Sequence, residues 1–552
     1  MTTISYLTAE IMLKSDIPTY SGGLGGVAGD TVRAVSNMSY DEFPFDFVAT
    51  SLLYPEGYFT QRIVNGRQCE EYPRWNPADH GLTLLPEKVI LDVHDHRVEV
   101  RAWRYDQRGR KRIVPVHLLD TSELSGCNNS DYDRRITSRI YFGGDYERLL
   151  QEYVLGVGSV RMLEAAGHDV SMHHLNEGHA AFVVAERLRR GEKIEHIRNT
   201  TASTIHSPVA GDNCFDYDLI RNVFNGNMPT NIADFADQRG RFGMTRLALN
   251  GSGRAIGVSR KHGEVSRGMF CDINHVYIDH VTNGADHLTW TADAFQRVYD
   301  KDLPDWRDNP SRLADAGIID RRKIRAARMT SKRAMARYLQ EEHGITIDPS
   351  RPVVTWARRF DGSRFDGEKW SSYKRPELIF MKIDRLEEVL RKTGAHLLFA
   401  GKAHPNNEVA KDEMSRVIWH IGELNAAGIP SYFVPNYNMD TCRYLTSGSD
   451  VWLNTPWIPL EAAGTSGMCA APNGVPQAST RDGWWLEGFN GRNGWVIGGE
   501  RSDDEVDVRS LYSVLESALG SDTTEMSVGA IETGAVFNAN RMVKQYADVL
   551  YK

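Results

Sequence analysis

The sequence predicts an α/β fold in two successive halves, and three observations lead to this prediction. The chain has 552 residues, more than one hydrophobic core usually holds, so two or three domains are expected. In both halves, short apolar or β-branched segments alternate with helical stretches, as they do in parallel sheets with helical crossovers. Several of these segments end in loops with polar or glycine residues, where ligands of open parallel sheets bind.

The first half shows this alternation at three segments. Residues 45–54 and 112–120 are apolar and β-branched, so we expect buried strands there. Residues 146–167 have a helical pattern that ends at a glycine, which predicts a long helix. Between residues 283 and 306 the sequence becomes irregular and rich in Asp, Thr, Pro and Trp, and we place the inter-domain hinge there.

The second half repeats the pattern after a basic helical segment at residues 321–344. Four strand candidates follow, at residues 352–360, 395–403, 431–437 and 449–456. Two Rossmann-like halves that face each other across a cleft form the GT-B architecture, which is the fold we predict. The expected domains are residues 1–290, residues 291–530, and a C-terminal helix at 531–552 that packs back toward the first domain.

Composition excludes several classes of protein. A net charge of -8 and a pI near 6.2 argue against a nucleic-acid partner. No apolar stretch is long enough to span a bilayer, and the N-terminus lacks the features of a secretory signal. The six cysteines contain no CxxC pair, which favours a reducing cytoplasm and mostly buried thiols. We therefore predict a cytoplasmic protein without membrane or nucleic-acid partners, and we leave homodimer formation open.

A glycine cluster at residues 17–30, IPTYSGGLGGVAGD, precedes a helical pattern. Glycines let backbone N–H groups approach an anion, and the N-terminus of the following helix favours negative charge. A glycine cluster by itself is more often only a tight turn.

The wider set of motifs resembles the glycogen and α-glucan phosphorylase family. Its blocks occur in order from Tyr6 to about Trp495 and include TIHSPVAGD, WARRF, YKR, GKAHP and NTPWIPLEAAGTSGMCAAPNGV. By this resemblance, the glycine loop lies against the cofactor phosphate and the sugar. His206 would hydrogen-bond a sugar hydroxyl, and Glu461 would bind a hydroxyl of the transferred sugar. Arg359 and Lys374 would hold the substrate phosphate, with Lys402 as a further contact.

The chain departs from the family at two places. In the bacterial branch the ARRF and YKR blocks are nearly continuous, whereas here residues 361–372 separate them, which suggests a changed or larger anion. Cys469 stands where the family has a lysine that carries pyridoxal phosphate as a Schiff base. A thiol cannot form that linkage. Cys469 is better interpreted as a buried, space-filling thiol than as a nucleophile.

From these departures we predict a retaining glycosyltransferase that uses no cofactor and no metal. It would transfer a sugar from a nucleoside-diphosphate sugar to a small acceptor, with antibiotic or other specialised-metabolite biosynthesis as a setting. The first domain would take the acceptor and the second the donor phosphates. The predicted catalytic residues are Glu461, His206, Arg359 and Lys374. The predicted donor-binding and phosphate-binding residues are Gly22, Gly23, Leu24, Gly25, Arg358, Lys402, Gly464 and Thr465.

Two alternatives remain open at this point. One is an α-glucan phosphorylase that binds pyridoxal phosphate without a covalent bond. The other is a non-catalytic sugar-binding protein that descends from an enzyme. The converging polar residues Glu461, His206, Arg359 and Lys374 count against the second alternative.

Overall fold

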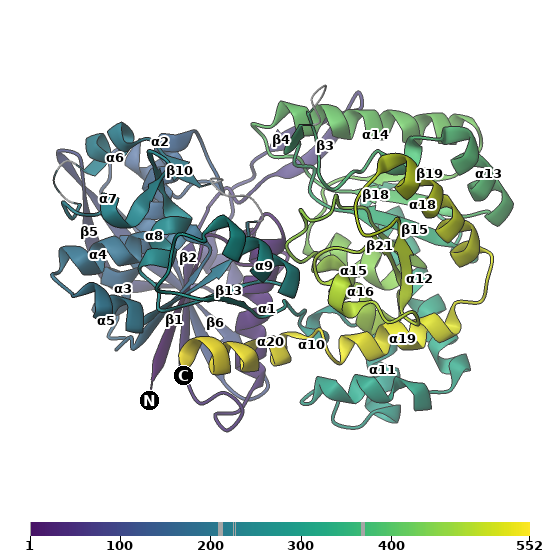
Figure 1. The fold of residues 1–552 in the computed structure, drawn as a ribbon, viewed down its shortest axis with the longest axis horizontal. Coiled ribbons are helices and arrows are strands. Elements are labelled where there is room, and N and C mark those ends of the chain that lie inside the picture. The colour runs from purple at the N-terminus through teal and green to yellow at the C-terminus, as the bar shows by residue number, and fades with distance from the viewer. Residues whose placement is uncertain (1, 208–212, 225, 227, 366–369) are drawn as a thin grey trace. The chain divides into compact units, whose positions relative to one another are not determined.

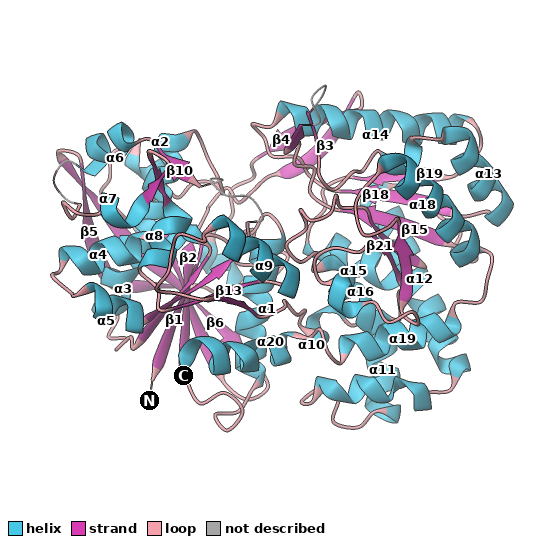
Figure 2. Cartoon of the chain, in the orientation of Figure 1, coloured by secondary structure: helices cyan, strands magenta, loops and turns pink. Residues whose placement is uncertain are grey.

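The computed structural model describes residues 2–207, 213–224, 226, 228–365 and 370–552. Helices and strands alternate along most of the chain (Figure 1 and Figure 2). The predicted α/β class is therefore confirmed. A separate result concerns membranes: within the described ranges, every helix is too short or too polar to cross a bilayer.

The chain divides into two compact units. Unit 1 comprises Met1–Phe59, Tyr72–Thr282 and Asn540–Lys552, and unit 2 comprises Thr60–Glu71 and Asn283–Ala539. The sequence had placed a single boundary after residue 290 and a terminal element at 531–552. In the structure the division follows Thr282, and a short segment of the first half belongs to unit 2.

Unit 1 is built on a nine-stranded sheet. In spatial order its strands are β14 (Ile278–His280), β13 (Arg254–Gly257), β9 (Thr201–Ile205), β8 (Met172–Asn176), β1 (Thr3–Thr8), β2 (Asp46–Leu52), β7 (Ile113–Asp120), β6 (His96–Arg108) and β5 (Thr83–Val93). Neighbours from β14 to β7 are parallel, and β6 is antiparallel to both β7 and β5. The strands predicted at residues 45–54 and 112–120 are confirmed as β2 and β7.

The long helix predicted at residues 146–167 is present in three parts. It consists of α2 (Asp145–Tyr153), a π-helical turn at Val154–Gly158 and α3 (Ser159–Ala165). A Cβ added to Gly156 would lie 2.6 Å from Cβ of Phe182, so glycine is needed where α4 (Phe182–Arg189) approaches. The other helices of unit 1 are α1 (Gly23–Asn37), α5 (Ile194–Asn199), α6 (Tyr217–Phe224), α7 (Ala233–Ala236), α8 (Met244–Asn250), α9 (Arg260–Met269) and α20 (Ala539–Tyr546).

Unit 2 contains a six-stranded, all-parallel sheet. In spatial order its strands are β19 (Ser431–Val434), β18 (His396–Ala400), β15 (Val353–Ala357), β20 (Val451–Asn454), β21 (Gln477–Thr480) and β22 (Gly494–Ile497). The first four of these confirm the four strand candidates of the second half. The longer helices are α11 (Asp293–Asp302), α12 (Arg321–His343), α13 (Ile383–Thr393), α14 (Glu408–Ala426), α15 (Met439–Gly448), α18 (Asp504–Leu519) and α19 (Thr524–Gly534).

Local sequence explains why these elements start and stop where they do. The Asp320 side chain accepts a hydrogen bond from the Arg322 amide and caps the start of α12. Gly344, with φ of +67°, ends the same helix in the left-handed conformation. All five residues of β15 are buried, as expected for a central parallel strand. The polar residues that follow β15, β18 and β20 therefore lie at the carboxyl edge of the unit 2 sheet.

Candidate functional site

Three predicted basic residues of unit 2, Arg358, Arg359 and Lys402, lie on two adjacent loops, which follow β15 and β18. The loops pair with each other: the Arg358 amide donates to the Ala400 carbonyl (3.1 Å), and the Phe360 amide donates to the Lys402 carbonyl (3.0 Å). A Cβ on Gly401 would lie 1.9 Å from the Arg358 carbonyl oxygen, so only glycine permits this approach.

Arg358 and Glu461 form a buried ion pair in unit 2. Both residues are 8% exposed, and Nη2 of Arg358 donates to Oε2 of Glu461. Burial disfavours the guanidinium charge, but Glu461, Tyr373 and Asp361 together outweigh this effect and hold the pKa of Arg358 above its ordinary value. Nη1 of Arg358 is buried and has no hydrogen-bond partner among the described residues. A buried guanidinium with an unused donor is suited to a second anion.

Lys374 forms a second ion pair, with Asp361 at the start of the inserted segment. Nζ of Lys374 lies 3.4 Å from Oδ2 of Asp361. Burial lowers the pKa of Lys374 to about 8, Asp361 opposes this shift, and Arg359 and Arg358 add to it. Burial raises the pKa of Asp361, but the charges of Lys374 and Arg359 outweigh it, and the net shift is downward. Residues 366–369 of the insertion lie outside the described residues.

The segment after β20 carries Glu461 and the cysteine that replaces the family lysine. Gly464 adopts φ of +82° and turns the chain into the short helix α16 (Ser466–Ala470). The Thr465 carbonyl accepts from the amides of Met468 (2.9 Å) and Cys469 (3.1 Å). Cys469 is 5% exposed.

Tyr437 links this cysteine to a second one. Burial raises the pKa of the Tyr437 hydroxyl well above its usual range, and the thiols of Cys442 and Cys469 raise it further. The side chain at position 469 thus faces an interior region that contains a phenol and another thiol. Because the side chain at position 469 is a thiol and not an amine, an imine to pyridoxal phosphate cannot form there.

In unit 1, a carboxylate shapes the predicted glycine loop. Glu10 accepts hydrogen bonds from the amides of Ser21 and Gly22 (3.0 Å for Gly22), from the Ser21 hydroxyl (3.0 Å) and from the Tyr141 hydroxyl (2.9 Å). A Cβ on Gly25 would lie 2.9 Å from Oε2 of Glu10, so the loop needs glycine at that position. Gly23 and Leu24 form the first turn of α1, which begins directly after this loop.

His206 lies elsewhere in unit 1, directly after β9. Its Nε2 is 2.6 Å from Oδ1 of Asn176, and its backbone amide donates to Oε2 of Glu177 (2.7 Å). Glu177, which has φ of +77°, also accepts from the amides of Gly178 and Ser207, both at 2.9 Å. Burial lowers the pKa of His206 to about 3, so the ring is neutral near pH 7. Residues 208–212, the rest of its motif, lie outside the described residues.

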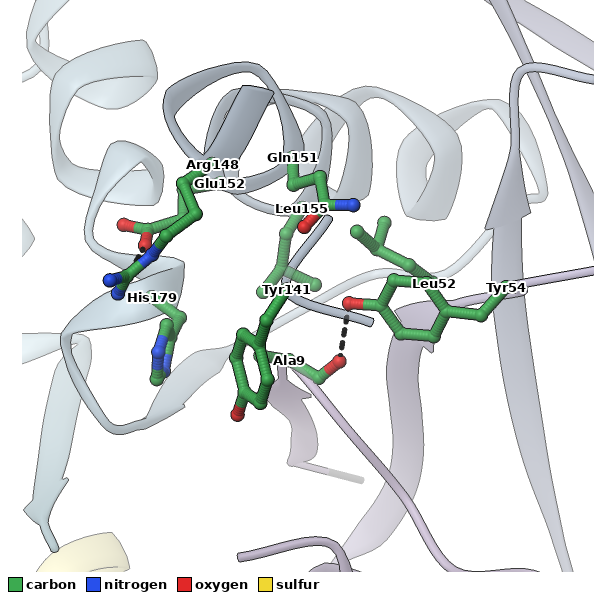
Figure 3. A pocket seen from close by; sticks show the side chains of 9 residues that line it. All are labelled: Ala9, Leu52, Tyr54, Tyr141, Arg148, Gln151, Glu152, Leu155 and His179. Atoms are coloured by element: carbon green, nitrogen blue, oxygen red, sulfur yellow. Dashed lines mark hydrogen bonds and ion pairs between the residues drawn. The ribbon is translucent and has the colours of Figure 1, made fainter. Parts of the chain in front are cut away.

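A small pocket lies in unit 1 between α2 and the end of β1 (Figure 3). Its volume is about 10 Å³, room for one water molecule. Figure 3 shows Arg148 and Glu152 of α2 beside His179. Burial raises the pKa of Glu152 to about 7, and burial with Arg148 lowers the pKa of His179 to about 3. Tyr141, which donates to Glu10, also lines this pocket.

The predicted site residues therefore fall into two groups, one in each unit. In unit 2, the charges of Arg358, Arg359 and Glu461 all act on Lys374, so these four residues form one cluster. Gly464 adjoins it, because a Cβ there would lie 3.5 Å from Cδ of Glu461, and Lys402 lies on the paired loop. The glycine loop and His206 belong to unit 1.

Sequence reasoning missed several residues that the structure places among these groups. Glu10 binds Gly22 of the glycine loop, Asp361 pairs with Lys374, and Asp482 accepts from the backbone amide of Glu461. Tyr141 donates to Glu10, and Glu152 lines the same pocket as Tyr141. One signal was available for Glu10, because it follows β1 by two residues, at the same sheet edge as the other polar loops. Asp361 opens the insertion that the sequence had singled out.

Comparison with known proteins identifies the family. A model of the carbohydrate phosphorylase family matches residues 221–551. The maltodextrin phosphorylase of Thermococcus litoralis is 31% identical over 99% of this chain and 70% of its own length. The glycogen phosphorylase of Aquifex aeolicus is 31% identical over 93% of this chain and 79% of its own length. An uncharacterized protein of Methanocaldococcus jannaschii is 28% identical over 99% of both chains.

These similarities overturn two predictions made from Cys469. The relatives are named phosphorylases, so the prediction of a transferase that takes a nucleoside-diphosphate sugar is wrong. The prediction of no cofactor is wrong for the same reason, because this family uses pyridoxal phosphate. Both predictions were based on the single substitution at Cys469, whereas the many retained motifs indicated a phosphorylase. By its motifs, its match to the family model and its relatives, the chain belongs to the carbohydrate phosphorylase family.

Proposed function

We propose that this protein is an α-glucan phosphorylase, which transfers a terminal glucosyl unit from a glucan to inorganic phosphate. The observation that carries the proposal is the unit 2 cluster, in which Arg358, Arg359 and Lys374 surround Glu461 at the carboxyl edge of the sheet. The names of its relatives, maltodextrin phosphorylase and glycogen phosphorylase, support this reaction. The mostly parallel sheet of unit 1 and the parallel sheet of unit 2 support the GT-B class, which we keep as part of the proposal.

In this proposal the basic side chains bind the substrate phosphate. Arg359 offers a planar guanidinium that can grip two phosphate oxygens, and Lys374 adds a point charge. Lys402 is a further phosphate contact on the paired loop. As the glucosidic bond breaks, these cations stabilise the negative charge of the phosphate group.

Each unit offers one side chain that is suited to hydrogen-bond a sugar hydroxyl. Glu461 accepts a hydrogen bond from a sugar hydroxyl, and its ion pair with Arg358 holds the carboxyl group in place. His206 is neutral, so its ring can both donate and accept a hydrogen bond. Asn176 occupies Nε2 of His206, which directs the other ring nitrogen to the substrate. The amides of Gly22, Gly23, Leu24 and Gly25 supply a surface of backbone donors in unit 1.

Pyridoxal phosphate fits this cluster only without a covalent bond. Position 469 is a thiol, whereas the unused Nη1 of Arg358 is suited to a phosphate group. The backbone amides of Gly464 and Thr465 are further candidates to hold that phosphate. When bound, the cofactor supplies a phosphate group that acts as acid and base toward the substrate phosphate.

Phosphorolysis of a maltodextrin by protein loaded with pyridoxal phosphate tests the proposal. Release of a sugar phosphate that depends on glucan, on phosphate and on the added cofactor would support it. Borohydride treatment should leave the cofactor removable by dialysis, with no reduced adduct on any lysine. Cofactor-independent activity, or binding of glucan without turnover, would overturn the proposal.

Two variants sharpen the same test. Arg359→Ala should raise the KM for phosphate by about tenfold or more and leave the KM for glucan unchanged, because one charge-assisted contact is lost. Arg509→Ala is the matched control, because Arg509 is an exposed arginine of the same unit on α18. Equal effects of the two changes would contradict a specific role for Arg359.

A further inference from the structure

A β-hairpin from the first part of the sequence belongs to unit 2. It consists of β3 (Thr60–Val64) and β4 (Arg67–Glu71), whereas the flanking residues Phe59 and Tyr72 belong to unit 1. Its turn is Asn65-Gly66, with φ of +51° and +76°, which are the left-handed angles of a two-residue type I′ turn. The sequence therefore encodes a tight hairpin that belongs to unit 2, although the residues before and after it in the sequence belong to unit 1.

The hairpin has one buried and one exposed face. Gln61 pairs with Glu70 and Ile63 pairs with Gln68 across the strands, so these four side chains share a face. Gln61 and Gln68 are 2% and 3% exposed, and Ile63 packs against the unit 2 core. On the opposite face, the exposed residues Arg62 and Glu71 form an ion pair.

Gln68 binds the backbone on the far side of Lys402. Its Nε2 donates to the Ala403 carbonyl (2.9 Å), and its Oε1 accepts from the Ala403 amide (3.0 Å). The side-chain amide thus makes the same pair of hydrogen bonds that a neighbouring strand would make. A helix residue completes the attachment, because Lys411 of α14 binds Glu70 of the hairpin at 2.9 Å.

Gln61 binds the residue on the near side of Lys402 and a third loop. Its Nε2 donates to the Gly401 carbonyl (2.9 Å) and to Oε1 of Gln68 (2.9 Å). Its Oε1 accepts from the backbone N–H of Asn436 (2.8 Å), and the backbone N–H of Gln61 donates to Oδ1 of Asn436 (3.2 Å). Asn436 has φ of +54° and directly precedes Tyr437, the residue beside Cys469.

The loop of Lys402 is therefore held from both sides. On one side the backbone of residues 358–360 pairs with it, and on the other the two glutamine amides do. Every polar atom of the two amides has a partner: the second donor of Gln68 goes to Oε1 of Glu70 (2.7 Å). A fully satisfied buried network of this kind fixes a loop in a single position.

We infer that Gln61 and Gln68 are positioning residues: they fix the loop that presents Lys402 and the loop that presents Tyr437. This inference rests on the proposed function only where it treats Lys402 as a phosphate contact. The position of Lys402 therefore depends on a hairpin that lies more than 330 residues earlier in the sequence and belongs to the same unit.

Burial offers a measurement of this positioning that needs no enzymatic activity. Desolvation lowers the pKa of the Lys402 amine to about 7. If the loop loosens, water reaches the amine and its pKa rises toward the ordinary lysine value. The titration midpoint of Lys402 can be followed by pH-dependent acetylation and mass spectrometry of the corresponding peptide.

The test uses the full chain loaded with pyridoxal phosphate and two substitutions. Gln68→Met keeps the size of the side chain but removes all its hydrogen bonds. Gln68→Glu keeps an acceptor for the Ala403 amide and for Nε2 of Gln61 but loses the two hydrogen bonds that Nε2 of Gln68 donates. For Gln68→Met we expect the KM for phosphate to rise about tenfold, the KM for glucan to stay unchanged, and the Lys402 midpoint to rise by about one pH unit or more. Gln68→Glu should fall between Gln68→Met and the unchanged protein.

Ile63→Ala is the matched control, because it loosens the packing of the same hairpin face without removing a hydrogen bond from the loop. If Ile63→Ala changes the KM for phosphate and the Lys402 midpoint less than Gln68→Met does, at a comparable loss of Tm, the positioning role is supported. Equal changes in the two variants, or an unchanged midpoint in a folded Gln68→Met protein, overturn it. If Gln68→Met does not fold, the same comparison is made with Gln68→Glu. A shifted midpoint without any phosphorolysis would support the positioning role and count against the proposed function alone.

Discussion

Two carboxylates of unit 1 and two of unit 2, all among the groups of candidate site residues, are held by different means. In unit 1, Glu10 and Glu177 accept hydrogen bonds from backbone amides and hydroxyl groups. In unit 2, Glu461 and Asp361 are paired with the cationic side chains of Arg358 and Lys374. The first two carboxylates are thus held by neutral donors, and the other two by opposite charge.

The two kinds of carboxylate have different roles: one fixes the conformation of a loop, and the other can be replaced by a ligand anion. A carboxylate that ties several amides together fixes the conformation of a loop, because its removal leaves those donors without an acceptor. A cation paired with a carboxylate can bind another anion instead, since guanidinium and ammonium groups bind phosphate as well as carboxylate. The predictions below test this contrast, from the largest expected effect to the smallest.

Breaking the pair between Arg358 and Glu461 should have the largest effect. Arg358→Met leaves the Glu461 carboxylate buried without its counter-charge, which should lower the free energy of unfolding by about 3–5 kcal/mol. Urea unfolding measures this loss. The double variant with Glu461→Gln should recover part of it, and a double variant as unstable as the sum of the two single ones would contradict a coupled pair.

The next prediction concerns Glu152 in unit 1, a buried carboxylate with fewer hydrogen bonds than Glu10 or Glu177 and a more distant cation than Glu461 or Asp361. It accepts one hydrogen bond from Asn213 (3.1 Å), and Arg148 lies 3.6 Å away. Burial raises its pKa from 4.5 to about 7, so the folded state retains a proton that the unfolded state has lost. This contribution to stability is fully present below pH 4.5 and is lost as the pH rises through 7.

The glutamine variant isolates this effect. Between pH 4.5 and pH 7.5 the stability of Glu152→Gln relative to the unsubstituted protein should increase by about 3 kcal/mol, because glutamine cannot ionise. Urea unfolding at the two pH values measures the difference. Parallel stability curves would show that Glu152 is ionised in the folded state.

The pair between Lys374 and Asp361 should show exchange with a ligand anion. With a pKa of about 8, Lys374 is charged below that pH and loses its charge above it, so phosphate binding should weaken as the pH rises through 8. In Asp361→Asn the competing carboxylate is gone, and phosphate should bind about tenfold more tightly at pH 6, a gain of about 1.4 kcal/mol.

The same variant should shift the pH profile. Asp361 raises the pKa of Lys374, so its removal should move the weakening of phosphate binding to lower pH. Calorimetric titration with inorganic phosphate at several pH values measures both effects. Unchanged affinity at pH 6 would mean that Asp361 does not compete with the anion.

Tyr141→Phe should have the smallest effect. It removes one of the donors to Glu10 and leaves the amides of Ser21 and Gly22 in place, so the expected loss of stability is about 1 kcal/mol. Thermal unfolding measures the change. A loss as large as that for Arg358→Met would remove the contrast between the two units.

Much of the fold could be predicted because its signals are local. The strands of the second half were recognised from runs of apolar residues, and α12 from its length and its terminal glycine. The π-helical turn in the first long helix was missed, and it contains Gly156, whose close neighbour Phe182 lies more than twenty residues further along the chain. The hairpin β3–β4 was also missed, since its own sequence does not indicate which unit it packs against.

The candidate site shows the same division. The sequence placed basic and glycine residues on loops after strands, and the structure has Arg358, Lys402 and Gly464 on such loops. It missed Asp361 and Glu10, because a carboxylate in a loop carries no local mark of the group that it will meet. The reasoning from Cys469 to a different donor failed, since the loss of one anchor changes how a cofactor is held and does not by itself change the reaction.

The sequence by itself determined the α/β class, the family and the absence of an amine at position 469. These features depend on residue identity, on periodicity and on motifs that are short in sequence. Only the tertiary structure decided that Arg358 meets Glu461, which lies 103 positions further along the chain, and that Gln61 and Gln68 hold the loop of Lys402. The physical reason is that hydrophobic burial brings distant segments together without regard to their polar groups, and the hydrogen bonds and charges of those groups then select their partners in three dimensions.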